Sequence, residues 1–490
     1  MRKLYGWKTS IALFVLYAAT VIAVHAQTFT TLVVFDQTNG GSPAGSLIQG
    51  LDGNFYGTTN FGGNNNCGWA GGCGTLFRIT PSGTLTTLYE FCSQPQCSDG
   101  VFPNAALVLT SSGDFYGTTA GDGEHNDGTV FKISRGALTT LYSFCSLPKC
   151  ADGYGPGQLM QAVDGNFYGT TIEFGAYSYG TVFRITPAGA LTTLQSFNGD
   201  NGGYPKGGLT QGVNGELYGT TSSGGTMNDE GTIYKVSPKG NFTTEYRFCR
   251  SGCSDGDGGF PTGTLVETNV NTFYGTTAVT DGTVFEFSQT GTLTYLYFFC
   301  EQGGGCPDGD TPAGLIQGTD GNFYGMALYG GSSDNCTGGC GTIFNIAPNG
   351  TFTVLHDFDG TNDGNNTSLG IALLQATNGK FYGLTNAGGS NIECSSYFTG
   401  CGTIFSLDIG LGPFVAFVRP FGKVGQTGGI LGQGFTGTTS VMLNGVSANF
   451  TVVSDTFVRA TVPEGATTGY VTVTTPTGVI TSNVPFHVIQ

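Results

Sequence analysis

The residues of this chain that could do chemistry lie in segments rich in glycine. His125 follows Glu124 and stands two residues before Asp127. A histidine flanked by carboxylates can act as an acid–base pair, but it can equally be a solvated side chain of a loop. The sequence contains no Gly-x-Ser-x-Gly, His-Glu-x-x-His or phosphate-loop motif. We therefore predict no catalytic site, and keep these three residues as candidates only.

Acidic pairs in two other glycine-rich segments offer oxygen ligands. They are Asp255 with Asp257 and Asp308 with Asp310. Loops of this composition can bind Ca²⁺, although none has the spacing of the EF-hand loop. Aspartates also stabilise turns by accepting hydrogen bonds from the nearby backbone, and we favour this second interpretation. No cofactor is predicted, and calcium stays an open alternative.

Aromatic residues in similar segments suit carbohydrate binding, because sugar rings stack on aromatic faces while their hydroxyls hydrogen-bond to amides and carboxylates. The candidates are Trp69, Tyr177, Tyr179 and Tyr397. Four further aromatics recur at one position of a tandem repeat and are predicted to pack between repeats: Phe102, Tyr154, Tyr204 and Phe260.

The 14 cysteines form seven close couples: Cys67/Cys73, Cys92/Cys97, Cys145/Cys150, Cys249/Cys253, Cys300/Cys306, Cys336/Cys340 and Cys394/Cys401. Their even number and local spacing, in a chain that begins like an exported protein, predict seven disulfides. Zinc is the alternative, but it needs four ligands, and no couple has a histidine close by in sequence.

A strand-like phrase repeated seven times must position all these residues. It is centred on tyrosines 50 to 60 residues apart, which are Tyr56, Tyr116, Tyr168, Tyr218, Tyr274, Tyr324 and Tyr382. Each repeat contains four short phrases rich in Thr, Val, Tyr and Phe, which we call strands A to D. Strand B carries Phe-Tyr-Gly-Thr-Thr, strand C carries Gly-Thr-Val-Phe, and strand D carries Leu-Thr-Thr-Leu-Tyr-x-Phe. Several short strands in a unit of this length are typical of β-propeller blades.

The position of strand D predicts how the repeats close. Its first copy, residues 29–35, precedes the first strand B, and no copy follows the last strand C at residues 402–406. We therefore expect the N-terminal strand to complete the seventh sheet and close a ring without exposed edges. The B–C and D–A loops then share one face with all the cysteine couples, where we expect binding. The A-strand glutamines are predicted to hydrogen-bond between sheets rather than line a channel: Gln49, Gln161, Gln211, Gln317 and Gln375.

The composition changes after Ile409. Residues 409–413 form a predicted linker, and residues 414–490 have no cysteine and no repeat phrase. This segment resembles an immunoglobulin-like IPT/TIG domain, in the run Ile430 to Phe435 and in Asn444-Gly445, Val462-Pro463 and Val471 to Val473. The resemblance implies a β-sandwich that serves as a spacer or interaction module.

The repeats resemble the GloVer-type tandem repeat of exported bacterial proteins. The residues that carry the resemblance include Asp164 to Thr171 and Gly180 to Ile185, and it extends over residues 29–408. It implies export but no assigned biochemical activity. Residues 1–26 agree, because a basic start, an apolar run from Ile11 to Val24 and small residues before Gln27 are typical of a secretory signal peptide. An uncleaved anchor is the alternative.

The charge of the chain limits its partners. The sequence has 17 basic and 33 acidic residues, and removal of Arg2, Lys3 and Lys8 with residues 1–26 leaves 14 against 33, a net charge of −19. A nucleic-acid backbone would be repelled, and no later segment is apolar for long enough to insert into a membrane after signal cleavage.

The sequence thus predicts an all-β protein that is secreted or held at the cell surface. Residues 27–408 are expected to form a seven-bladed β-propeller closed by the N-terminal strand, and residues 414–490 an immunoglobulin-like sandwich. The favoured function is binding of a glycan or a surface protein by the B–C and D–A loops. The alternatives are an extracellular carbohydrate-active hydrolase or lyase that uses carboxylates or His125, and a structural surface protein.

Overall fold

A computed structural model describes residues 27–68, 71–225, 230–249, 258–268, 272–301, 305–365, 371–391, 394 and 400–489. In these residues the protein is all-β, with 40 strands and two short 3₁₀ helices, η1 (Pro95–Cys97) and η2 (Pro148–Cys150). None of the helices in this part of the chain has the length and apolar content needed to cross a lipid bilayer. The predicted signal peptide, residues 1–26, lies outside the described residues.

The repeats fold into seven antiparallel sheets of four or five strands, numbered here in chain order. Sheet 1 contains β2 (Gly41–Pro43), β3 (Ile48–Gln49), β4 (Phe55–Phe61), β5 (Thr75–Ile79) and β6 (Leu85–Glu90). Sheet 2 contains β7 (Val108–Leu109), β8 (Phe115–Thr119), β9 (Thr129–Ser134) and β10 (Ala137–Ser143). Sheet 3 contains β11 (Tyr154–Pro156), β12 (Met160–Gln161), β13 (Phe167–Glu173), β14 (Thr181–Ile185) and β15 (Leu191–Ser196).

The remaining four sheets follow the same order. Sheet 4 contains β16 (Thr210–Gln211), β17 (Leu217–Thr221), β18 (Thr232–Val236) and β19 (Phe242–Arg247). Sheet 5 contains β20 (Val266–Thr268), β21 (Thr272–Thr277), β22 (Thr283–Ser288) and β23 (Leu293–Phe298). Sheet 6 contains β24 (Asp310–Gln317), β25 (Phe323–Tyr329), β26 (Thr342–Ile346) and β27 (Phe352–Asp357). Sheet 7 contains β28 (Leu374–Gln375), β29 (Phe381–Thr385), β30 (Thr403–Asp408) and, from the other end of the chain, β1 (Thr28–Val34).

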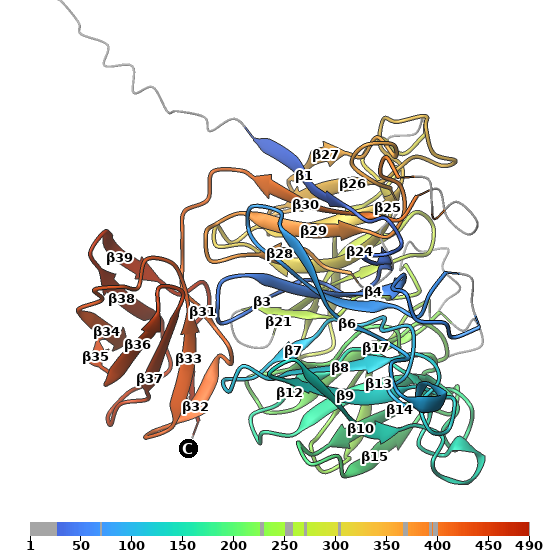
Figure 1. Cartoon of the computed structure of the whole chain (residues 1–490), viewed down its shortest axis with the longest axis horizontal. Coiled ribbons are helices and arrows are strands. Elements are labelled where there is room, and N and C mark those ends of the chain that lie inside the picture. Colours follow the sequence, from blue (N-terminus) through green and yellow to red (C-terminus); the bar gives the residue numbers. More distant parts are fainter. Residues whose placement is uncertain are drawn as a thin grey trace, which may run out of the picture.

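The N-terminal strand completes the last sheet. Strand β1 pairs antiparallel with β30, from Thr28 opposite Asp408 to Val34 opposite Thr403, and Figure 1 shows the two strands side by side. The predicted pairing of the first strand D with the last strand C is therefore confirmed. Without β1, strand β30 would present an unpaired edge, which favours association with other chains.

Aromatic residues of successive strands B pack against one another and so connect the buried core of each sheet with that of the next. The ring of the strand-B tyrosine lies against the first aromatic of the next strand B, with centroid separations of 4.1 to 4.5 Å: Tyr56–Phe115, Tyr116–Phe167, Tyr218–Phe273, Tyr274–Phe323, Tyr324–Phe381 and Tyr382–Phe55. Between sheets 3 and 4, Tyr168 and Leu217 share one buried cluster. The sequence of contacts returns to its start, because the tyrosine of sheet 7 packs on the phenylalanine of sheet 1.

The glycine of each Phe-Tyr-Gly phrase is needed for close packing. A Cβ atom on Gly57 would lie 2.6 Å from Cζ of Phe77, the aromatic residue of strand C directly opposite in the register. Side-chain atoms cannot approach so closely, so glycine in strand B and a flat ring in strand C are one packing unit. This explains why the two phrases recur together in every repeat.

Three of the five A-strand glutamines join neighbouring sheets among the described residues, as predicted. The side chains of Gln161 and Gln317 donate instead to a carbonyl of their own A–B turn. Oε1 of Gln211 accepts a hydrogen bond from the backbone N–H of Val163 in sheet 3, at 2.9 Å. The same bond links Gln375 to Thr319 at 3.0 Å, and Gln49 of sheet 1 to Thr377 of sheet 7 at 3.0 Å. The last of these spans 328 residues of sequence and fixes the closure a second time.

Residues 416–489 form three smaller sheets. One contains β31 (Ala416–Phe417), β33 (Thr427–Leu431), β37 (Phe457–Thr461) and β36 (Phe450–Ser454), and another contains β35 (Val446–Ser447), β34 (Ser440–Leu443), β38 (Val471–Thr475) and β39 (Gly478–Thr481). Strands β32 (Phe421–Lys423) and β40 (His487–Ile489) pair in parallel. The two larger sheets share one buried cluster, which includes Ile430 and Val458 from the first and Val441 and Val473 from the second.

This C-terminal unit contacts the A–B turns of the repeats. Thr456 Oγ1 donates to the carbonyl of Leu51 at 2.8 Å, and Gln433 Nε2 donates to Thr377 Oγ1 at 2.9 Å. In Figure 1 the unit, in orange and red, lies on the side of β3, β7, β12 and β28, which are strands A. The ends of the sheets that carry the B–C and D–A loops, called the loop face below, lie on the other side.

Candidate functional site

Six D–A loops reach the loop face through the same turn before a proline. The residue before the proline has a positive φ of 50 to 59° in all six: Ser42, Phe102, Gly155, Tyr204, Phe260 and Thr311. Its N–H donates to the carbonyl just before strand C of the preceding sheet, for example from Tyr204 to Tyr179 at 2.9 Å and from Ser42 to Cys401 at 2.8 Å. Each loop is thereby fixed on its neighbour, which gives the loop face a rigid base.

This turn corrects the predicted alignment of the loop aromatics. Phe102, Tyr204 and Phe260 do occupy one repeat position, but in sheet 3 that position holds Gly155. Tyr154 stands one residue earlier, where it begins β11. Its side chain therefore takes a different direction from the other three, and it lines a cavity.

The cavity has a volume of about 320 Å³ and lies where the D–A loops lead into strands A of sheets 1 to 4. Ala, Gly and Pro residues make up much of its wall, which keeps the space open. Its polar side chains are Ser46, Asn104, Tyr154, Gln158 and Lys206. Its volume lies at the lower end of the range of about 300–1,000 Å³ for small-ligand sites.

Some polar groups of the cavity are already engaged. Ser46 Oγ accepts from the N–H of Ala372 at 2.8 Å, and Gln158 Oε1 accepts from Thr264 Oγ1 at 3.4 Å. In the described part of the chain, the Gln158 Nε2 group and the side chains of Asn104 and Lys206 make no hydrogen bond or ion pair. The cavity thus presents an ammonium group and two amides to whatever enters it.

Aromatic side chains stand in the loops that adjoin the cavity wall at sheets 3 and 4, and we call Tyr154, Phe174, Tyr177, Tyr179 and Tyr204 the aromatic rim. Of these five, Tyr154 lines the cavity itself. Tyr154 packs edge-to-face on Phe174 with centroids 5.8 Å apart, and Tyr179 packs in the same way on Tyr204 at 5.7 Å. Tyr177 is 60% exposed. Tyr177 and Tyr179, both candidates from the sequence, therefore belong to one B–C loop, between β13 and β14. Trp69 and Tyr397 lie outside the described residues.

Six aromatic side chains in the described residues are strongly exposed, and five of them are on the loop face. The five are Phe174, Tyr177, Tyr179, Phe260 and Tyr329, and the sixth is Tyr470 of the C-terminal unit. Exposed aromatics gathered on one surface are typical of binding sites, because their burial by a ligand is favourable.

The three catalytic candidates lie on the loop face but do not line the cavity. Glu124 and His125 are exposed, and the backbone N–H of His125 donates to Ser143 Oγ at 3.2 Å. Asp127 is half-buried beside the Cys145–Cys150 disulfide, and burial together with the nearby Asp152 raises the pKa of its carboxyl. The disulfide sulfurs close to Asp127 are not thiolates, so this group lacks the ligands that zinc requires.

Of the metal candidates, Asp255 and Asp257 lie outside the described residues. The carboxylate of Asp308 is buried and accepts from the hydroxyl of Tyr297 at 2.8 Å and from the N–H of Cys300. Asp310 accepts from Thr311 Oγ1 at 2.7 Å, and burial together with Asp281 raises the pKa of its carboxyl. Of these contacts, the one from the N–H of Cys300 is of the kind that the turn interpretation expects, and the others come from side-chain hydroxyls.

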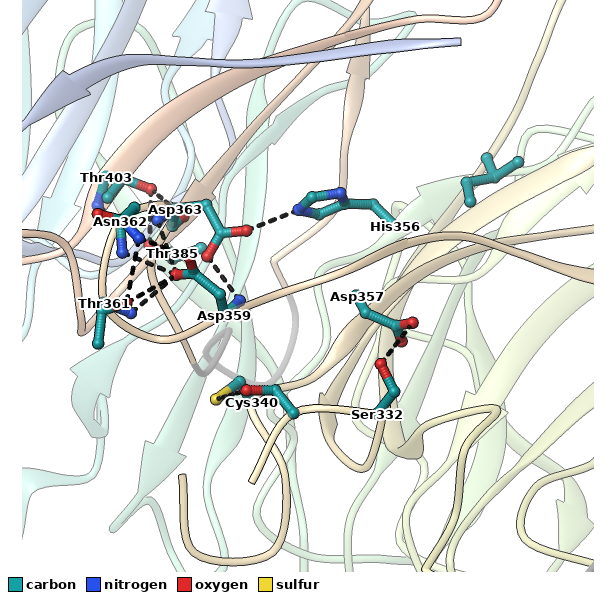
Figure 2. A network of polar contacts seen from close by, with 12 residues as sticks. Ser332, Cys340, His356, Asp357, Asp359, Thr361, Asn362, Asp363, Thr385 and Thr403 are labelled. Atoms are coloured by element: carbon teal, nitrogen blue, oxygen red, sulfur yellow. Dashed lines mark hydrogen bonds and ion pairs between the residues drawn. The ribbon is translucent and has the colours of Figure 1, made fainter. Parts of the chain in front are cut away.

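The bond between a strand-D side chain and a buried loop aspartate recurs in other sheets. Tyr89 donates to Asp99 at 2.7 Å, and Tyr142 donates to Asp152 at 2.8 Å. In sheet 6 His356 takes the place of the tyrosine, and its Nε2 atom lies 2.8 Å from Oδ2 of Asp363. Figure 2 marks this contact with a dashed line.

An earlier aspartate of that loop, Asp359, is also drawn in Figure 2 and organises the loop itself. Asp359 Oδ1 accepts from the N–H groups of Thr361 and Asn362. Burial alone would raise the pKa of Asp359, but the hydrogen bonds from Asp363, Asn362 and Thr361 outweigh it and hold the pKa well below its usual range. The acidic residues of this loop hold the backbone in place.

Six predicted disulfides are present: Cys67–Cys73, Cys92–Cys97, Cys145–Cys150, Cys300–Cys306, Cys336–Cys340 and Cys394–Cys401. Cys249 is disulfide-bonded as well, but its predicted partner Cys253 lies outside the described residues. No described cysteine is free.

A family model, the Gloeobacter/Verrucomicrobia repeat, matches residues 15–157 and 148–337, about two thirds of the chain. The chain belongs to the Gloeobacter/Verrucomicrobia repeat family. The repeat match expected from the Phe-Tyr-Gly and Gly-Thr-Val-Phe phrases is therefore confirmed. Sheets 6 and 7 continue the same phrases beyond residue 337.

Other comparisons place this Gloeobacter/Verrucomicrobia repeat protein less closely. None of the curated proteins matches it. Among solved structures, a structural-genomics target designated a candidate gluconolactonase shares 12% identity with a TM-score of 0.40, over 79% of this chain and 94% of that one. A luciferin-regenerating enzyme shares 12% identity with a TM-score of 0.38, over 63% of this chain and 92% of that one. Neither likeness bears on the activity of this chain.

Sequence reasoning missed Asn104, Gln158 and Lys206. Asn104 and Lys206 each directly follow the loop proline, where sheet 1 has Ala44 and sheet 5 has Thr262. The larger polar side chains of Asn104 and Lys206 at this position were the signal in the sequence that could have identified them as candidates. Its meaning depends on the four repeats meeting around one cavity, which no single repeat reveals.

Proposed function

We propose that this protein is an exported seven-bladed β-propeller that binds a glycan on its loop face. The seven sheets are the blades, residues 27–408 are the propeller, and residues 409–413 link it to an immunoglobulin-like domain of the IPT/TIG type, residues 414–490. The cyclic tyrosine contacts and the pairing of β1 with β30 support this architecture. The shared buried cluster of two four-stranded sheets supports the sandwich.

Export is part of the proposal. The disulfides of the loop face require an oxidising compartment to form and persist, and residues 1–26 have the composition of a signal peptide. We propose that the mature protein begins at Gln27 and is secreted or remains at the cell surface. N-terminal sequencing of the protein recovered outside the cytoplasm tests this, because a retained Met1 would contradict it.

One observation supports glycan binding above all: Tyr154 lines a cavity of monosaccharide scale that also carries two amide side chains, and the other rim aromatics stand in the loops that adjoin it. A sugar ring can stack on an exposed tyrosine while its hydroxyls hydrogen-bond to neighbouring polar groups. Disulfides and backbone hydrogen bonds hold the loops that carry these groups. A rigid site loses little conformational entropy when a ligand binds. A surface protein that presents such glycans would be recognised by the same groups.

The test is a glycan array probed with the mature protein and with Tyr177→Ala, Tyr179→Ala and Trp69→Ala variants. Tyr470→Ala is the matched control, because Tyr470 is also an exposed tyrosine, 48% accessible, but belongs to the C-terminal unit. We expect binding of a defined set of glycans, weakened about tenfold or more by a rim substitution and unchanged by the control. Absence of binding to every glycan, or equal effects of rim and control substitutions, would refute the proposal.

A further inference from the structure

We propose that the central cavity binds an acidic saccharide, whose carboxylate pairs with Lys206. This inference rests on the proposed glycan-binding function and names the class of sugar. The charge of the cavity differs in sign from the net charge of the molecule. The chain has a formal net charge of −16, yet the charged residue of the cavity wall is a lysine.

Lys206 lacks the carboxylate partner that three other lysines of the chain have. Lys132, Lys235 and Lys380 each lie 2.8 to 3.1 Å from a carboxylate, whereas Lys206 forms no ion pair with any described residue. Pro205 follows the fixed turn at Tyr204, so the backbone that carries Lys206 is held in place. An ammonium group at the edge of a concave, amide-lined space attracts an anion more strongly than one on a convex surface.

The neighbouring groups select a sugar acid rather than a bare anion. Asn104 and the Nε2 group of Gln158 can hydrogen-bond to ring hydroxyls, and Tyr154 offers a ring face at the same wall. A carboxylate bound to an ammonium group forms a charge-assisted hydrogen bond, which is stronger than a bond between neutral groups. A uronic acid carries a carboxylate, hydroxyls and a ring on one scaffold and therefore matches the three kinds of group.

Access to the cavity is from the loop face. Its wall consists of D–A segments, of Ala120, which directly follows β8, and of Ile172, near the end of β13. The C-terminal unit lies against the A–B turns at the other ends of the same strands, where it contacts Leu51 and Thr377. A polysaccharide chain could thus cross the loop face and place one acidic residue in the cavity.

The experiment titrates the mature protein by calorimetry with three probes: a galacturonic acid tetramer, the same tetramer with its carboxylates methyl-esterified, and a neutral galactose tetramer. Lys206→Met removes the charge but keeps the aliphatic stem, and Lys206→Arg restores the charge. Lys239→Met is the matched control, because Lys239 is also exposed but lies in a C–D turn on the opposite face. Inorganic phosphate at constant ionic strength serves as competitor.

We expect the acid to bind about tenfold or more tightly than its ester, and Lys206→Met to abolish that difference. Lys206→Arg should keep most of it, and Lys239→Met all of it. Equal affinity for acid and ester, equal effects of the two Met variants, or displacement by phosphate at the concentration of the sugar would overturn the inference. Binding of neutral glycans alone, sensitive to Tyr177→Ala, would overturn the inference but leave the proposed function intact. Absence of binding to any sugar would overturn both.

Discussion

The hydroxyl group of Tyr234 is a defect in an otherwise regular core, and its removal should stabilise the protein. Strand C carries phenylalanine at this position in the other six sheets: Phe77, Phe131, Phe183, Phe285, Phe344 and Phe405. Tyr234 is fully buried, and its hydroxyl has no hydrogen-bond partner among the described residues. Burial also holds the pKa of Tyr234 far above its ordinary value.

The magnitude follows from the desolvation of one hydroxyl group. A buried polar group without a partner costs about 1–3 kcal/mol. The hydroxyl fits in the core because Gly219 has no side chain. A Cβ atom on Gly219 would lie only 2.5 Å from the hydroxyl oxygen of Tyr234. Tyr234→Phe leaves a gap of one oxygen atom, which returns part of the gain. We therefore expect Tyr234→Phe to raise the free energy of unfolding by about 1 kcal/mol.

The assay is urea denaturation followed by fluorescence, with the midpoint compared at unchanged slope. Phe183→Tyr is the matched control, because it places the same hydroxyl in the equivalent position of sheet 3, where Phe183 is fully buried. That variant should lose about 1–3 kcal/mol. If Tyr234→Phe lowers the midpoint, the hydroxyl is satisfied by a buried water molecule, and the reasoning is refuted.

Three further predictions concern pH, disulfides and the C-terminal unit. Burial and acidic partners raise the pKa of Tyr142 and Tyr274 to about 12, so the stability that they contribute is complete below pH 10 and should be lost between pH 10 and 12. The difference in phenolate absorbance at 295 nm between the native protein and Tyr142→Phe isolates one of them, and a difference that titrates near pH 10 would contradict this. Replacing Cys336 and Cys340 by serine should lower the free energy of unfolding by about 2 kcal/mol, measured by urea denaturation, whereas an unchanged midpoint would show that this ring adds no stability. Gln433→Ala removes a hydrogen bond between the C-terminal unit and sheet 7 and should cost about 1 kcal/mol; a calorimetric melting curve identical to that of the native protein would argue against this contact.

The features of the fold that repeat could be predicted from the sequence. Glycine in strand B and a ring in strand C recur because each pair packs within one repeat, as Gly57 and Phe77 do. The pairing of β1 with β30 was predictable because one copy of strand D is displaced to the start of the chain. The bond between Gln49 and Thr377 follows from the same closure.

The candidate site was predictable only in part, because it depends on loop lengths and on contacts between repeats. Tyr177 and Tyr179 stood out as aromatics without counterparts in other repeats, and both belong to the rim. Tyr154 was misaligned with Tyr204 because both stand seven residues before the glutamine of strand A. The segment from Pro156 to Gln161 is one residue shorter than that from Pro205 to Gln211, so relative to the proline Tyr154 stands one position earlier. The wall around Lys206 is built from four repeats, so its composition cannot be read from any one of them.

One buried residue connects the closure of the repeats with the C-terminal unit. Thr377 is fully buried, its N–H donates to Gln49 Oε1, and its Oγ1 accepts from Gln49 Nε2 and from Gln433 Nε2. Its carbonyl accepts from the N–H of Phe414. The contact between sheets 1 and 7 is the one that opening of the ring must break, and the C-terminal unit holds the same residue.

Because the C-terminal unit lies against the A–B turns, the two ends of the sheets have different roles. The A–B turns are short and are used for closure and for holding the C-terminal unit, so they have little freedom to vary. The loop face carries the disulfides, the exposed aromatics and the mouth of the cavity, and there insertions of different length can be tolerated without disturbing the closure. A ligand that binds at Lys206 would therefore meet loops whose length can change, while the ring beneath them is held by separate contacts, such as those of Gln49 with Thr377.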